Sequence, residues 1–211
     1  MTQTITISGH TFILHPSAAV FWEERNTLLI SDVHLGKVSH FRKHGMAIPE
    51  SAIRSNFDRL DAVVAYFAPK TVIFMGDLFH SNKNREWGLF EDWVRSAEAK
   101  MVLIAGNHDI ISQDHYDGLD IGIYEELIVD GFLLTHHPEE REGLFNLCGH
   151  IHPAIELRGM GRQFLKLPCF FQKHQQMILP AFGEFTGTYV MTPEAHDCVY
   201  AIAKDRIVLV C

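Results

Sequence analysis

Two aspartates, one asparagine and four or five histidines stand in short motifs that could bind metal ions. The motifs are Asp32-Val33-His34, Gly76-Asp77, Gly106-Asn107-His108-Asp109, His136-His137 and Gly149-His150-Ile151-His152. Their oxygen and nitrogen donors suit Mn²⁺, Fe, Zn²⁺ or Co²⁺, whereas a thiolate zinc site or a Ca²⁺ cage would use other residues. The donors are too many for one tetrahedral ion. They fit two divalent ions about 3.5–4 Å apart that share a bridging carboxylate.

The spacing within the motifs predicts which side chains share a site. In an extended segment residues i and i+2 point to the same side of the chain, so the two donors of Asp-x-His should reach one site, as should those of His-x-His. His136 and His137 are adjacent, so only one of them is expected to face that site. Asp109 is expected to cap a following helix or to orient His108 rather than to bind a metal.

Each motif follows a short apolar run that is typical of a buried central strand. The runs are Thr27–Ile30, Thr71–Met75, Met101–Ala105, Phe132–Thr135 and Leu144–Cys148. Asn107 follows Asp77 by 30 positions and His136 follows Asn107 by 29, which is the length of a strand–helix–strand crossover. Strands joined in this way are parallel, and their carboxyl ends meet at one edge of the sheet, where ligands bind. We therefore expect the five motifs to converge at such an edge.

Helices are predicted between the first of these strands, and further strands towards both ends of the chain. Ser51–Phe67 has apolar residues three and four positions apart, and Pro49 and Ser51 mark its start. A second stripe with helical spacing, interpreted as core, consists of Trp87, Phe90, Trp93, Val94 and Ala97. Other strands are predicted in the segments TITI, HTFILH and AVFWEE and at Phe164–Phe171, Gln176–Leu179, Thr188–Met191, Val199–Ala203 and Arg206–Val210. This order predicts an α/β (α+β) fold with two sheets packed together and helices on the outside.

The composition is that of a folded domain. The chain has 211 residues, of which 47% are hydrophobic and 21% charged, values that exclude general disorder and fit one domain over residues 1–211. No apolar run reaches the roughly 18 residues of a membrane helix. The segment MTQTITISGHTF is unlike a secretory signal, so a cytoplasmic location is expected. The four cysteines form no CxxC pair, so neither a disulfide framework nor a thiolate zinc site is indicated. The net charge of −8 argues against nonspecific binding to nucleic acid or membranes.

The five motifs in this order resemble those of the calcineurin-like metallophosphoesterase superfamily, over Asp32 to His152. A closer resemblance is to the bacterial DNA-ligase-associated phosphoesterases, which are thought to act in DNA repair. It rests on Leu35-Gly36-Lys37, His40-Phe41-Arg42-Lys43, Gly45, Pro49, Gly76-Asp77-Leu78-Phe79-His80-Ser81 and Thr135-His136-His137-Pro138. The resemblance implies a four-layer αββα sandwich of two mixed β-sheets flanked by helices.

The same resemblance implies a ligand set for two divalent ions, with Mn²⁺ as the expected metal. One ion would take Asp32, His34, Asp77 and His152, and the other Asp77, Asn107, His136 and His150. Asp77 would bridge, and a hydroxide held between the ions would attack the phosphorus in line. His108 would act with Asp77 and Asn107 in catalysis by donating a proton to the leaving-group oxygen.

Residues beside the motifs are candidates for substrate binding. The strip Lys37–His44 is dense in cations and follows the first motif, so it could contact a phosphodiester backbone while Phe41 stacks on a base. The alternative is a solvated helix face. Within the strip, the closer resemblance favours His40 and Arg42. His80 could contact phosphate or make a structural hydrogen bond.

The leading hypothesis is a dimetal phosphoesterase that cleaves phosphodiesters, as a phosphodiesterase or nuclease in DNA repair. The alternative is a phosphomonoesterase acting on small molecules or proteins, because the same metal centre serves both reactions. A non-catalytic protein-binding scaffold would be expected to lack a donor, and none is missing. A phosphodiester substrate such as nucleic acid is the expected partner. A DNA ligase or helicase is implied by the closer resemblance only, and the oligomeric state is not predicted.

Overall fold

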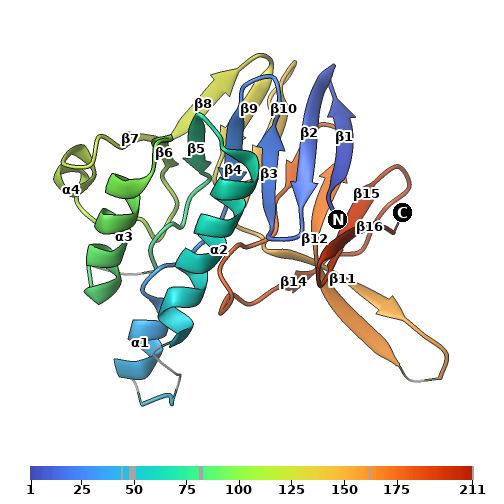
Figure 1. The fold of residues 1–211 in the computed structure, drawn as a ribbon. Coiled ribbons are helices and arrows are strands. Elements are labelled where there is room, and N and C mark those ends of the chain that lie inside the picture. The colour runs from blue at the N-terminus through green and yellow to red at the C-terminus, as the bar shows by residue number, and fades with distance from the viewer. Residues whose placement is uncertain (44, 48–50, 81–82, 162, 211) are drawn as a thin grey trace.

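Two β-sheets pack face to face in the computed structural model of the protein, and helices lie against the outer face of the first sheet (Figure 1). The structure describes residues 1–43, 45–47, 51–80, 83–161 and 163–210. Three residues quoted in the sequence predictions, Pro49, His44 and Ser81, lie outside the described residues.

The first sheet joins an antiparallel half to a parallel half. Across the sheet, its described strands are β1 (Gln3–Ile7), β2 (His10–His15), β3 (Ala19–Trp22), β4 (Thr27–Ile30), β5 (Thr71–Phe74), β6 (Lys100–Ile104) and β7 (Gly122–Tyr124). β1 to β4 are antiparallel neighbours, and the turn between β1 and β2 is tight because Ser8 and Gly9 both adopt positive φ. β4 to β7 are parallel, and the crossovers from β4 to β5 and from β5 to β6 contain helices.

The second sheet is also mixed. Across it, the described strands are β14 (Tyr189–Val190), β11 (Pro153–Arg158), β12 (Phe164–Lys173), β13 (Gln176–Ile178), β10 (Phe145–Cys148), β9 (Phe132–Thr135) and β8 (Glu126–Val129), while β15 (Cys198–Ala203) pairs with β12 and β16 (Arg206–Leu209) with β15. β12 pairs with β11 through its first half and with β13 and β15 through its second half. Each predicted strand is found to within one or two residues. β7, β8 and β11 were not predicted.

Two apolar layers hold these elements together. The described helices are α1 (Lys37–Lys43), α2 (Ser51–Phe67), α3 (Arg85–Ser96) and α4 (Gln113–Asp117). Trp87, Phe90 and Trp93, predicted as core, are buried in the cluster between the helices and the first sheet, and a second cluster lies between the sheets. The fold of two mixed sheets with flanking helices is confirmed. The described residues after Asp117 contain no helix. Besides the two large clusters, the second sheet has a third and smaller cluster of buried apolar side chains.

None of the helices in the described ranges combines the length and the apolar composition that a membrane crossing requires.

One predicted connection is wrong. The residues between Asn107 and His136 form α4, β7 and β8, so the crossover after β6 leads to its parallel neighbour β7 and not to β9, the strand before His136. β8 pairs with β9 in an antiparallel manner, so the chain changes from the first sheet to the second here. The five motifs therefore follow strands of two sheets, β4, β5 and β6 in the first and β9 and β10 in the second. Apolar runs identify buried strands, but they do not say to which sheet a strand belongs.

Candidate metal centre

The strand ends of the two sheets meet at one place. The N–H of Asp32 donates to the carbonyl of Gly76 (3.1 Å), which ties the end of β4 to that of β5. Between the sheets, the N–H of His150 donates to Oδ2 of Asp32 (3.0 Å). Within the second sheet, the N–H of Gly149 donates to the carbonyl of His136 (3.0 Å). The motifs converge as expected, although two sheets rather than one build the edge.

Asp32, His34 and His152 form the first group of donors. Oδ1 of Asp32 lies 3.0 Å from Nε2 of His152 and 3.9 Å from Nε2 of His34, and the two Nε2 atoms are 3.5 Å apart. Oδ1 of Asp32 is buried, and its neighbours in this group are the two imidazole nitrogens, while Nδ1 of His34 is buried without a hydrogen bond. Burial of a carboxylate is costly, and a divalent cation beside Asp32 would offset that cost. These residues therefore fit a metal ion.

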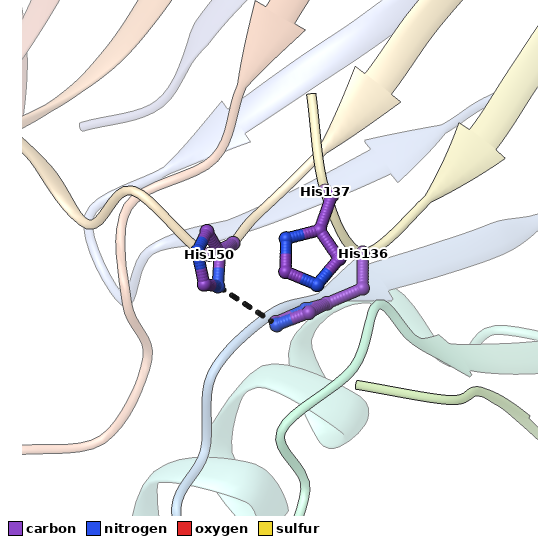
Figure 2. A group of neighbouring side chains, drawn as sticks. All are labelled: His136, His137 and His150. Carbon is purple, nitrogen blue, oxygen red and sulfur yellow. Dashed lines mark hydrogen bonds between the residues drawn. The ribbon is translucent and has the colours of Figure 1, made fainter. Parts of the chain in front are cut away.

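Asp77, Asn107, His136 and His150 form the second group. Nε2 of His136 lies 3.4 Å from Oδ1 of Asp77, 3.3 Å from Oδ1 of Asn107 and 3.3 Å from Nδ1 of His150 (Figure 2). Nδ1 of His136 lies 2.9 Å from the carbonyl oxygen of Met75. Because a carbonyl only accepts, Nδ1 donates, and Nε2 is the ring nitrogen that faces the group and could bind a cation in place of a proton. Oxygen and nitrogen atoms that face one another in this way fit a cation between them.

The two groups adjoin at Asp77. A carboxylate oxygen of Asp32, one of Asp77 and a nitrogen of His136 lie within 4.8 Å of one another. Asp77 is buried, and its carbonyl accepts from the N–H of His34 (3.0 Å), so its backbone also belongs to the first group. A carboxylate in this position fits a bridge between two ions.

Five of the candidate donors have a left-handed backbone. Asp32, His34, Asp77, His150 and His152 have φ values of 55°, 50°, 51°, 67° and 53°. This region is uncommon for residues other than glycine, and it persists only where the surroundings fix the chain. The hydrogen bonds between the strand ends supply that restraint. The concentration of strain at these positions is typical of a functional site.

Among the motif glycines, Gly76 and Gly149 are positions of close approach to candidate donors or their neighbours. A Cβ atom on Gly76 would lie 2.2 Å from Nδ1 of His136. A Cβ atom on Gly149 would lie 1.7 Å from Oγ of Ser31 and 2.6 Å from Oδ2 of Asp32. A larger residue at either position would displace a candidate donor, which explains glycine in these motifs.

Neighbouring charges hold most donors in the forms that bind metals. Burial raises the pKa of Asp77, but the side chain and charge of His136 outweigh burial and hold it below its ordinary value. The pKa of Asp32 is lowered in the same way, mainly by His152 against the effect of burial. Burial lowers the pKa of His34 to about 3, so this imidazole is neutral. Burial also lowers the pKa of His136, but Asp77 and Asp32 outweigh it and raise the value, so a cation would replace a proton there.

His108, His80 and His40 lie beside the first group. The ring centroid of His34 is 5.8 Å from that of His108 and 5.7 Å from that of His80, while His108 and His80 are 5.2 Å apart and His80 and His40 are 5.5 Å apart. The backbone N–H of His108 donates to Oδ1 of Asp77 (2.9 Å), which holds His108 beside the donor groups. The structure thus brings His108, His80 and His40 to the donor groups.

Residues Lys37–Lys43 of the cationic strip form α1. Arg42 is exposed on this helix. Lys37, at its first position, is half-buried, and burial lowers its pKa while the charges of Asp32 and Asp77 oppose that effect. Lys37 therefore lies near carboxylates of both groups of donors. From the sequence, His40 and Arg42 were favoured instead. The position of Lys37, three residues after the candidate donor His34, could have indicated that it lies near the site.

Asp109 joins two of the motif loops. Its Oδ2 accepts from the N–H of Gly106 (2.9 Å) and its Oδ1 from the N–H of Phe79 (3.2 Å). The next helix, α4, begins later and has Ser112 at its N-cap, so the helix-capping prediction is wrong. Burial raises the pKa of Asp109 to about 6. Its observed role is to hold the loop after β5 against the loop after β6.

Sequence analysis missed Glu86. This buried carboxylate on α3 accepts from the N–H of Gly36 (2.6 Å) and from the N–H and hydroxyl of Ser39 (3.2 and 2.7 Å). It thereby fixes the start of α1 directly after the first motif. Glu86 lies on the same helix face as Phe90 and Trp93, which is otherwise apolar. An acidic residue on such a face could have indicated a buried hydrogen-bonding role.

His137 departs from the expectation for adjacent residues. Its ring centroid lies 4.1 Å from that of His150 and 4.8 Å from that of His136 (Figure 2). Adjacent side chains were expected to point to opposite sides, and that prediction is wrong because the chain turns after β9.

Comparison with known proteins agrees with this geometry. Residues 25–167, more than half of the chain, match the family model of the calcineurin-like phosphoesterases. No curated protein sequence matches the chain. The crystal structure of the nuclease MPE of Pseudomonas putida has 33% sequence identity and a TM-score of 0.85, with 100% of each chain covered. Yfce, a phosphoesterase from E. coli, has 15% identity and a TM-score of 0.46, with 87% of this chain and 97% of that chain covered.

The family match includes every candidate donor from Asp32 to His152, at the ends of the strands that bring these donors together. The chain therefore belongs to the calcineurin-like phosphoesterase family.

Proposed function

We propose that this protein is a dimetal-dependent phosphodiesterase that acts on nucleic acid strands, as a nuclease in DNA repair. The observation that carries the proposal is the pair of donor groups that adjoin at Asp77. Identity of 33% over the whole chain to a bacterial nuclease supports nucleic acid as the substrate class. The role in repair rests on the closer resemblance of the motifs alone.

Each donor group would hold one ion. Asp32, His34, Asp77 and His152 would bind the first, and Asp77, Asn107, His136 and His150 the second. When bound, two divalent ions lower the pKa of a shared water and neutralise the charge on the phosphoryl oxygens. Mn²⁺ is the proposed metal, because carboxylate, amide and imidazole donors without thiolate accept it. The two carboxylates supply the negative charge that allows two cations to lie close together.

The side chain of His108 would protonate the leaving group. The backbone of His108 is bonded to Asp77, so its ring stands at the edge of the metal groups. There it would donate a proton from a ring nitrogen to the oxygen that leaves phosphorus. His80 lies beside His34 and His108, and His40 lies beside His80, so these two histidines would contact the next phosphate of the strand.

α1 would guide the strand into the site. Lys37 begins the helix beside the donor groups, and Arg42 is exposed further along it. Since the net charge is −8, attraction to phosphates must come from such a local group of cations. Phe41 is partly exposed on the same helix and would stack on an unpaired base, which favours single-stranded over duplex substrate.

The test compares a diester with a monoester and one strand with two. Metal-free protein is supplied with Mn²⁺ and then with EDTA, and bis-p-nitrophenyl phosphate, p-nitrophenyl phosphate, single-stranded DNA and duplex DNA serve as substrates. We expect Mn²⁺-dependent hydrolysis of the diester and faster cleavage of the single strand. Hydrolysis of the monoester alone would favour a phosphomonoesterase. Inactivity with every divalent metal would favour a protein-binding scaffold.

A further inference from the structure

Three imidazoles, not two, meet beside Asp77 on the side of the second sheet. A nitrogen from each of His136, His137 and His150 lies within 4.8 Å of the other two. Figure 2 shows the ring of His137 beside both of the other rings. His136 is buried, His150 is partly buried and His137 is exposed, so the three rings run from the interior to the surface. His137 is not needed for the four-donor set proposed for the second ion.

The turn after β9 places His136 and His137 on the same side. The hydroxyl of Thr135 donates to the carbonyl oxygen of His137 (2.7 Å), which bends the chain at the end of the strand. Nδ2 of the buried Asn146 donates to that hydroxyl (2.7 Å), and Oδ1 of Asn146 accepts from the N–H of Glu139 (3.1 Å). The backbone is thus anchored before and after His137. A buried and satisfied polar network of this kind specifies one local conformation.

The surroundings of His137 favour a metal over a hydrogen-bond partner. The ring contacts found for His137 in the described part of the chain are with His136 and His150, which are donor candidates themselves. Nδ1 of His150 and Nε2 of His136 already face each other at 3.3 Å. Imidazole nitrogens gathered in this way are the donors that Zn²⁺, Co²⁺ and related ions prefer.

We propose that His137 is an additional nitrogen ligand of the second ion, beside Asn107, His136 and His150. The inference rests on the proposed function, because that function requires the second ion. With His137 the second site offers three imidazoles, whereas the first offers two. The two sites should therefore differ, and the second should hold Co²⁺ or Zn²⁺ more tightly relative to Mn²⁺ than the first does.

Titration of metal-free protein with Co²⁺ tests this directly, without any activity assay. Calorimetry gives the stoichiometry and the affinities, and visible absorption reports the ligand field of each bound ion. Wild type should bind two ions. Loss of even an indirect partner of a metal ligand costs about 10–100-fold in affinity, so His137→Ala should weaken one of the two ions at least about tenfold and change its absorption, while the other ion is unaffected.

Two further variants make the result specific. His137→Gln keeps a polar side chain of similar length but lacks the imidazole nitrogens, so it should behave like His137→Ala. His174→Ala removes an exposed histidine from the turn between β12 and β13, outside the five motifs, and should match wild type.

The failures are distinguishable. If both His137 variants bind two Co²⁺ ions with the affinities and spectra of wild type, His137 is not a ligand, and the dimetal function stands. If wild type itself binds fewer than two ions, the dimetal function and the role of His137 are both wrong.

Discussion

At the scale of single residues, Asp77 links the two groups of candidate metal donors to His108, the proposed proton donor. Asp77 faces His136 with its carboxylate and accepts from the backbone of His108 with the same oxygen. The proposed metal binding and the placement of the proposed proton donor would therefore depend on one side chain. The role of His108 can be separated from metal binding, because its ring is not part of the donor set.

His108→Ala should slow substrates unequally. A p-nitrophenolate leaves readily without a proton, whereas the alkoxide of a sugar needs one, so cleavage of DNA should fall more than hydrolysis of bis-p-nitrophenyl phosphate. General-acid catalysis contributes about 10²–10⁴-fold, which sets the expected loss on DNA. Rates on both substrates measure it, with bound Mn²⁺ as the control. An equal loss on both substrates would argue against proton donation.

Gly149→Ala should damage the first metal site. The added methyl would meet Oγ of Ser31 and Oδ2 of Asp32 well inside van der Waals contact, so Asp32 must move. Overpacking of this kind costs about 1–3 kcal/mol, and displacement of Asp32 should remove one ion. Thermal unfolding and metal analysis measure both effects. Gly187→Ala is the matched control, because no atom lies within 4 Å of its Cβ position. Binding of two ions by Gly149→Ala would contradict this prediction, since it would mean that Asp32 can move without loss of the ion.

At the scale of secondary-structure elements, the helices position the site from outside the sheets. α3 holds the start of α1 through Glu86, and α1 brings His40 towards His80. The amphipathic pattern of α3 predicts that its apolar face is buried. It does not predict the contact of Glu86 with α1, because an acidic residue does not fit an apolar face. Positioning of α1 is therefore a property of two helices that are distant in the sequence.

Glu86→Gln should affect long substrates more than short ones. The amide keeps the volume but accepts fewer hydrogen bonds, so α1 should lose part of its anchor at a cost of about 1–3 kcal/mol in stability. KM for single-stranded DNA should rise, while kcat for bis-p-nitrophenyl phosphate should stay near wild type. Glu98→Gln, an exposed substitution beyond the end of the same helix, is the control. A purely structural role of Glu86 would instead lower kcat for both substrates together.

At the scale of the whole molecule, the fold brings together strand ends that the sequence separates. The strands themselves could be predicted, because each is a short apolar run closed by glycine or a polar residue. Their division between two sheets could not, since β6 and β9 have the same kind of apolar sequence. The seven candidate donors were identified from their motifs. Three features of the site could not be predicted, because they depend on tertiary contacts that no local sequence pattern records. They are the left-handed backbone at Asp32 and His150, the hydrogen bonds by which Asp109 joins two loops, and the turn at His137.

Metal ions should stabilise the whole fold. Buried carboxylates and strained strand ends meet at the site, and ions that bind only the folded state add about 2.7 kcal/mol per site at 100 times the Kd. Saturating Mn²⁺ should therefore raise the Tm of metal-free protein by about 5–10 °C per site, at about 2–4 °C per kcal/mol. Ca²⁺, which prefers all-oxygen sites, should have a smaller effect. An unchanged Tm in Mn²⁺ would mean that the folded protein does not bind these ions.

The central claim is that two ions share Asp77, and anomalous diffraction from a crystal grown with Mn²⁺ tests it most directly. The account predicts two anomalous peaks about 3.5–4 Å apart on either side of the Asp77 carboxylate, one beside Asp32 and the other beside His136. A single peak, or the absence of any peak between these side chains, would contradict it.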